Sequence, residues 1–244
     1  MSKTLLTIGF VAAGLVSAWA GDDKEVDEAI ARFKKGMANP SAPARATAVT
    51  DLAGTKSEKT AKMLGGLLVS DTEPVRKAAA AGLGGFVDYK KLATPMLLNG
   101  LNVNYSQQES KVVEAICQAL GKLDDDVALP ALHRYFEDKD AVVASAALLG
   151  AAEIRHVSSI DLIIDLMRKY DKIIENSKGG GGGGYGGVNV PGGGGGGDPK
   201  TTLAKAVMPA CIKAMQHISG DKWTTVKEWE IWWSKRKATF KIEK

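Results

Sequence analysis

The sequence has little of the chemistry from which most catalytic and metal sites are built. It contains three histidines among 244 residues, and these stand apart from one another, at His133, His156 and His217. There is no HExxH motif, no Cys/His pair at metal-ligand spacing and no GxSxG motif. The sequence therefore predicts no catalytic residue, no metal site and no cofactor, and it favours a protein that is not an enzyme.

Cysteine, net charge and long apolar runs are also scarce. Cys117 and Cys211 lie in different expected helices without the spacing of a disulfide framework, a pattern more typical of buried thiols. A net charge of +4 is too small to indicate binding to nucleic acid. The longest apolar run, over residues 4–16, is shorter than the roughly 20 residues of a membrane-spanning helix.

That apolar run has the form of a secretory signal peptide. Lys3 precedes it, and the small residues Ala18 and Ala20 follow it with the spacing of a cleavage site. We therefore expect residues 1–20 to be removed and residues 21–244 to reach the periplasm or the cell exterior. In the alternative case the signal is not cleaved and anchors the protein to a membrane.

Patterns that indicate strands are rare, and a helical repeat takes their place. Four segments rich in alanine and leucine align without gaps, and they end at Ala53, Gly84, Gly121 and Gly150. An amphipathic stretch precedes each segment, over 24–37, 57–69, 89–101 and 126–137. Each unit is thus two helices and a turn. The alignment places one leucine of each unit at the same core position: Leu52, Leu83, Leu120 and Leu149.

One of these segments carries a specific resemblance. "SDTEPVRKAAAAGLGGF" resembles the second helix of a HEAT repeat, in which an Asp precedes the helix and a Val-Arg pair lies in its first turn. Asp71 and Arg76 match this pattern, and so does Arg45 in the unit before. The resemblance implies a stacked Asp/Arg ladder at these three residues. Val113 and Val142 replace the arginine in the next two units, so we expect the ladder to stop there.

The repeat predicts the fold class. A two-helix unit cannot bury its apolar face alone, so units stack and share one core. We expect an all-α protein, and the HEAT resemblance implies a right-handed α-α superhelix, an armadillo-type solenoid, of about five helix pairs over residues 21–220.

Fourteen of the 28 glycines lie between residues 179 and 197. A phosphate-binding loop is not indicated, because a helix precedes the tract and Asp198 and Pro199 separate its last glycine from Lys200. We expect a disordered insertion between the two helices of the fifth unit. Either it is a tolerated low-complexity expansion, or it is a mobile arm in which Tyr185 contacts a partner.

Four of the five tryptophans lie in the last 22 residues, at Trp223, Trp229, Trp232 and Trp233. The last three share one side of a helix. Because a solenoid must cover its last apolar layer, we expect residues 221–244 to form a Trp-rich, basic cap. This ending resembles the tail of exported bacterial HEAT-repeat proteins. In a second interpretation the tryptophans and lysines bind sugars, anionic polymers or lipid head groups.

The resemblance is specific for the fold and says little about activity, because repeat folds have many binding functions. The function that we predict is a protein-binding scaffold, whose second helices present the solvent-facing Lys77, Glu114 and Gln118 on a concave face. One alternative is an enzyme or accessory protein that holds a small ligand, as repeat-built bilin lyases do. The other is attachment to the cell envelope through the tail. The sequence defines neither the partner nor the oligomeric state.

Overall fold

The computed structural model describes residues 12–179 and 198–242, and all regular secondary structure in this part of the chain is helical. Its α-helices, in chain order, are α1 (Ala12–Met37), α2 (Ala42–Gly54), α3 (Glu58–Leu67), α4 (Glu73–Leu83), α5 (Lys90–Ser106), α6 (Ser110–Leu123), α7 (Leu129–His133), α8 (Ala141–Ile154), α9 (Ser158–Gly179), α10 (Pro199–Ser219) and α11 (Val226–Arg236). Two short 3-10 helices, η1 (Val87–Tyr89) and η2 (Asp126–Ala128), precede α5 and α7.

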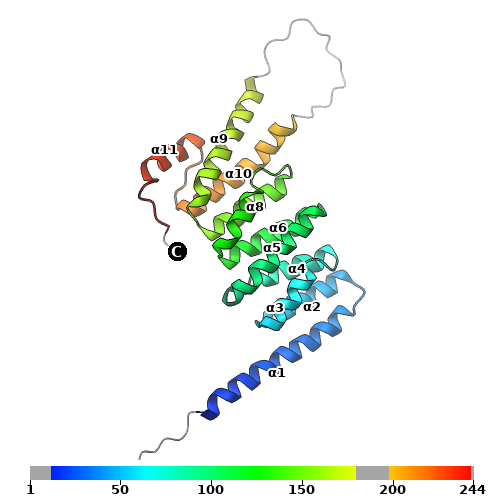
Figure 1. Cartoon of the computed structure of the whole chain (residues 1–244). Helices are drawn as coiled ribbons and strands as arrows, with labels where there is room; N and C mark the ends of the chain where they lie inside the picture. Colours follow the sequence, from blue (N-terminus) through cyan, green and yellow to red (C-terminus); the bar gives the residue numbers. More distant parts are fainter. Residues whose placement is uncertain (1–11, 180–197, 243–244) are drawn as a thin grey trace, which may run out of the picture.

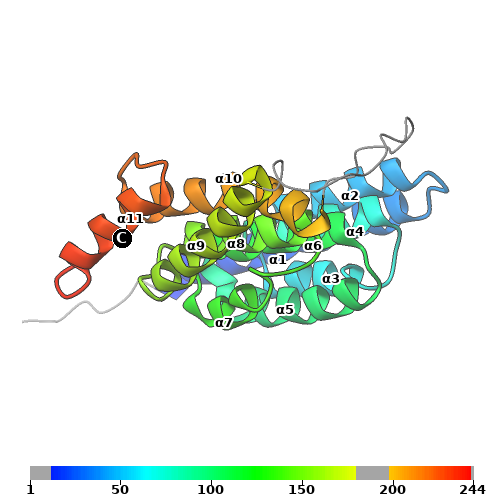
Figure 2. The ribbon, with the colours of Figure 1, turned by 90° about the horizontal axis from the view of Figure 1, so that it is seen from above.

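The helices form two layers that follow chain order. Helices α2, α4, α6, α8 and α10, here called the B layer, each pack against the next one along the chain. Helices α1, α3, α5, α7 and α9, the A layer, each pack against the B helix that follows them. Figure 1 shows the resulting stack from α1 to α10 and α11, and Figure 2 shows the B layer above α3, α5 and α7. The chain therefore forms five consecutive helix pairs and a final helix.

Polar side chains in the turns cap the N-termini of several helices. Asp140 and Asp198 are N-caps, and each carboxylate accepts a hydrogen bond from a backbone N–H in the first turn of its helix. Thr225 and Glu228 form a reciprocal capping box at the start of α11. These contacts satisfy backbone donors that have no partner inside a helix.

Small residues let the B helices approach closely. A methyl group built on Gly84 would lie 2.9 Å from the Cα of Ala119, and one on Gly150 would lie 2.5 Å from the carbonyl oxygen of Cys117. Large side chains fill the space between the layers, and Leu52, Leu83 and Leu120 have at most 1% of their surface exposed. The core is thus continuous from one helix pair to the next.

The register that we expected for the fourth unit is wrong by two residues. α8 begins 31 residues after α6, whereas the alignment on Gly150 gives a spacing of 29. Leu149 is half-buried rather than in the core, and Ala151 is buried at the position equivalent to Leu120. Val142 is exposed, and the residue equivalent to the ladder arginines is the buried Ala144. The cause is the composition of α8, which is so uniformly apolar that its pattern does not set a register.

Three further expectations concern the first helix of the fourth unit, the glycine-rich insertion and the signal peptide. The first helix of the fourth unit, expected over 126–137, consists only of η2 and the five residues of α7. The glycine-rich insertion lies outside the described residues except for its first glycine, which ends α9. The backbone of α1 includes the last part of the expected signal peptide. Among the described helices, none has the length and apolar character needed to cross a membrane.

Candidate binding surface

A groove runs along the outer side of the B layer, where α6, α8 and α10 lie next to one another. It has a volume of about 380 Å³. Its lining residues are Glu114 and Gln118 from α6, Ala141, Val142, Ser145, Ala146 and Leu149 from α8, and Ala206 from α10. We call this the B-layer groove.

The B-layer groove combines an apolar floor with one polar edge. Val142 is 43% exposed and Leu149 is half-buried, so both present aliphatic surface to solvent. Ala146 is buried and adds no bulk, which leaves the groove shallow. On the α6 side, the Gln118 amide donates a 3.4 Å hydrogen bond to the Glu114 carboxylate. Such a surface can bury apolar side chains of a partner and offer hydrogen bonds at one edge.

The structure brings together two of the four residues expected to bind a partner. Glu114 and Gln118 line the B-layer groove. Lys77 has the equivalent position to Glu114 on α4, but its ammonium forms an ion pair with Glu73 at 3.6 Å, and it does not line the groove. Tyr185 lies outside the described residues.

Sequence reasoning missed the aliphatic part of the groove. Leu149 was assigned to the core and Val142 to the ladder position, because the gapless alignment shifted the fourth unit. The available signal was Asp140, a good N-cap residue, since counting from that cap gives the correct register.

The first ladder pair lies between the first two units. The guanidinium of Arg45 donates to both oxygens of Asp71, at 2.8 Å from Nη2 and 3.3 Å from Nε. Arg45 also donates to the backbone carbonyls of Asn39 and Pro40. The hydrogen bond from Arg45 lowers the pKa of Asp71 to about 2. The pair therefore joins the first turn of α2 in the first unit to the turn between α3 and α4 in the second.

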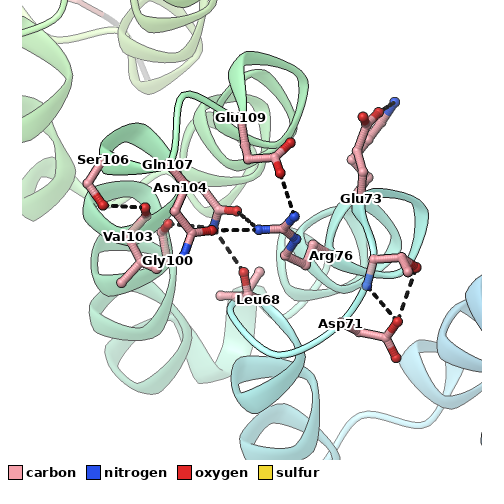
Figure 3. Close-up of polar contacts among 12 residues, drawn as sticks. Leu68, Asp71, Glu73, Arg76, Gly100, Val103, Asn104, Ser106, Gln107 and Glu109 are labelled. Carbon is pink, nitrogen blue, oxygen red and sulfur yellow. Dashed lines mark hydrogen bonds and ion pairs between the residues drawn. The ribbon is translucent and has the colours of Figure 1, made fainter.

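Arg76 contacts the next unit and not Asp71 (Figure 3). Its Nη1 donates to the side-chain oxygens of Asn104, at 2.9 Å, and Gln107, at 3.0 Å. Its Nη2 donates to Glu109 at 2.8 Å. Arg76 is only 8% exposed, so this is a largely desolvated cation with acceptors around it. Glu109 stands in the place of the expected Asp, and sequence reasoning did not find it.

Three of the four C-terminal tryptophans are buried against the last A helix. Trp229, Trp232 and Trp233 are at most 6% exposed, and α11 packs on α9. The indole N–H of Trp233 donates to Asp161 of α9 at 2.8 Å, and Lys237 binds the same carboxylate oxygen at 2.8 Å. These bonds, first that from Lys237, lower the pKa of Asp161. The tail thus covers the end of the A layer.

Trp223 differs from the other three, because it precedes α11 and is 41% exposed. It lines a pocket of about 390 Å³, together with Glu228, Ile231, Trp232, Lys235 and Arg236. Arg236 lies over the Trp232 ring, 5.5 Å from its centroid, and pairs with Asp221 at 2.9 Å. We call this the Trp223 pocket.

The cysteines have the character of structural thiols. Cys117 and Cys211 are free and buried, and desolvation raises the pKa of each to about 12. At neutral pH both are therefore protonated and unreactive. In the part of the chain that the structure describes, no three His, Cys, Asp or Glu side chains are grouped so that they could hold a metal ion.

Comparisons with known proteins add no assignment. No protein-family model matches the sequence, and no curated protein matches it either. The function is therefore inferred from the geometry of this chain.

Proposed function

We propose that the protein is an exported, non-enzymatic scaffold of the HEAT type, a right-handed solenoid whose concave B layer holds a segment of another protein. The observation that carries the proposal is the B-layer groove, in which Val142 is exposed and Leu149 only half-buried among small residues. Exposed aliphatic side chains on packed helices do not stabilise the isolated fold, whereas burying them against a partner is favourable.

The shape of the groove favours a protein segment over a small molecule. It crosses three helices and is open to solvent, whereas small-molecule sites usually enclose most of the ligand and direct several polar groups toward it. An apolar side chain of a partner can rest on Ala146 between Val142 and Leu149. A polar backbone or side-chain group can then bond to Gln118 or Glu114.

Site-specific cross-linking tests this proposal. A photoreactive amino acid replaces Gln118 in the mature chain, and Val127 of η2, which is exposed outside the groove, is the matched control position. After irradiation in the native envelope, we expect one protein adduct from position 118 and none from position 127. The double variant Val142→Ser/Leu149→Ser should abolish the adduct while the helical CD signal persists. Equal labelling from both positions, or an adduct that survives the double substitution, contradicts the proposal.

A second candidate function is attachment to the cell envelope through the Trp223 pocket. The observation in its favour is that Trp223 and Ile231 remain exposed beside Lys235 and Arg236, although the other three tryptophans of the tail are buried. An aromatic face next to cations suits a sugar ring or an anionic polymer.

Co-sedimentation with envelope fragments tests the attachment. The variant Trp223→Ala should remove the protein from the pellet, and Val157→Ala, at a similarly exposed position on another surface, should not. If both variants sediment like the wild type, the Trp223 pocket has no role in attachment.

A further inference from the structure

Arginine is missing from the ladder position of the third helix pair. We call this position the vacant place. Arg45 and Arg76 are each the fourth residue of a B helix, and each guanidinium binds acceptors of the next unit. The fourth residue of α6 is Val113, whose side chain has no donor for such acceptors. The structure has a cavity of about 430 Å³ at this position, lined by Tyr105, Ser106, Gln108, Glu109, Ser110, Val113, Asp138, Lys139, Asp140 and Val143.

The acceptors of the vacant place are present although the arginine is not. Gln107 and Glu109, which bind Arg76, lie three residues and one residue before α6. Asp138 and Asp140 lie three residues and one residue before α8, and both line the cavity. The vacant place therefore has two carboxylates, whereas the place of Arg76 has one carboxylate, Glu109, and two neutral amides, Asn104 and Gln107.

Only neutral groups satisfy these carboxylates. The Tyr105 hydroxyl donates to Asp138 at 2.6 Å, and the Ser110 hydroxyl donates to Asp140. The backbone N–H groups of Asp140 and Val142 each donate to one of the two carboxylates, at 2.8 Å. Among the described residues, neither aspartate forms an ion pair. Each oxygen has lone pairs left for a further donor.

The geometry points to a receptor site for a guanidinium group from outside the chain: the cavity between the N-terminal ends of α6 and α8 binds an arginine side chain of the partner protein. The acidic residues are not the only support, because Gln107 and Glu109, at the same positions before α6, hold the guanidinium of Arg76 one unit earlier. At the junction before that, Arg45 binds Asp71. The planar fork of arginine can bond to two carboxylates at once, whereas the ammonium of lysine is a more strongly hydrated point charge.

The cavity lies beside the B-layer groove. Val113 and Val143 line the cavity, and the next residue of α6 and the preceding residue of α8, Glu114 and Val142, line the groove. A protein segment in the groove would thus pass the mouth of the cavity. That the arginine belongs to a protein partner rests on the proposed function, whereas recognition of the guanidinium group does not.

An NMR titration of the mature protein tests the site. The probe is N-acetyl-arginine methylamide, and the corresponding citrulline and lysine derivatives are the controls. We expect saturable shifts of the Val113, Asp138 and Asp140 amide signals with the arginine probe. Binding of the lysine derivative should be at least tenfold weaker, and the neutral citrulline derivative should produce no saturable shift. Equal responses to arginine and citrulline, or no response to either, overturn the proposal.

Two variants test whether the arginine probe binds in this cavity. Val113→Arg supplies the missing side chain, so the probe should no longer shift these signals and the melting temperature should rise; Val113→Met is the control of similar length without charge. Because a buried substitution can impair folding, Asp138→Asn provides a second test on the half-buried rim. It keeps an acceptor for the Asp140 N–H and should weaken probe binding at least tenfold. Unchanged affinity in Asp138→Asn contradicts the site.

The two proposals can fail separately. Saturable arginine binding without a cross-linked partner at position 118 would retain the guanidinium site and remove the scaffold function. A cross-linked partner together with no arginine binding would do the reverse.

Discussion

The close approach of α6 and α8 predicts that two glycine-to-alanine substitutions change the free energy of unfolding in opposite directions. Gly150→Ala places a methyl group 2.5 Å from the carbonyl oxygen of Cys117 and 3.1 Å from its carbonyl carbon. The first distance is about 1 Å shorter than ordinary van der Waals contact. The obstacle is backbone inside an intact helix, so no side chain can rotate away, and α6 and α8 must separate.

The magnitude follows from two opposing effects. Alanine is more favourable than glycine inside a helix by about 1 kcal/mol, whereas forcing extra volume into a packed interface costs about 1–3 kcal/mol, occasionally more. Because the clash involves backbone, we expect Gly150→Ala to lower the free energy of unfolding by about 2 kcal/mol net. In a chain of this size that corresponds to a decrease in Tm of about 4–8 °C.

Gly66→Ala is the matched control. Gly66 is exposed in α3, and no atom lies within 4 Å of the added methyl group. Only the helix preference acts there, so we expect a gain of about 0.5–1 kcal/mol. Both variants are compared with the wild type by urea and thermal denaturation, followed by CD at 222 nm. If Gly150→Ala is as stable as the wild type, the reasoning about the α6–α8 contact is wrong.

Three further predictions concern groups with defined partners. Because Arg45 lowers the pKa of Asp71 to about 2, the stabilisation by this pair is present above the unfolded-state pKa of about 4 and is lost as the pH falls to 2; urea midpoints of Asp71→Asn and the wild type should therefore differ at pH 6 and converge near pH 2. In the native protein Cys117 and Cys211 should not react with a thiol reagent at pH 8, and both should react in urea; a reactive native thiol would contradict their burial. Trp233→Phe removes an indole N–H that donates to a carboxylate of α9, and we expect a loss of about 1 kcal/mol in unfolding free energy; no loss would show that α11 does not depend on this bond.

The sequence predicts the helices well and their register less well. Caps such as Asp198 and periodic apolar residues are local signals, and they locate most helices to within a few residues. In α8 nearly every residue is apolar, so periodicity does not distinguish Leu149 at the surface from Ala151 in the core. The exposed face of the B layer, and with it the groove, therefore required the three-dimensional structure.

The partners of charged side chains depend on contacts between units. Arg76 and Glu109 are 33 residues apart, in units whose spacing is not constant. The sequence pattern singles out the arginine, but only the packed structure identifies its acceptors. The same holds in the tail, where helical spacing predicts that three tryptophans share a face, whereas the exposure of Trp223 follows from its place before α11.

The junction between α6 and α8 is stable without an arginine at the vacant place. The stability of the fold does not account for the charge of Asp138. The approach of Gly121 and Gly150 packs these two helices closely, so the junction does not need a side chain to join its units. Asp140 has a structural role as the N-cap of α8. Asp138 accepts the Asp140 N–H, but asparagine would accept it equally well without a second negative charge two residues away. The carboxylate of Asp138 also accepts a hydrogen bond from the Tyr105 hydroxyl at 2.6 Å, and neither hydrogen bond requires a full charge on the acceptor. The proposed guanidinium would give this charge a partner.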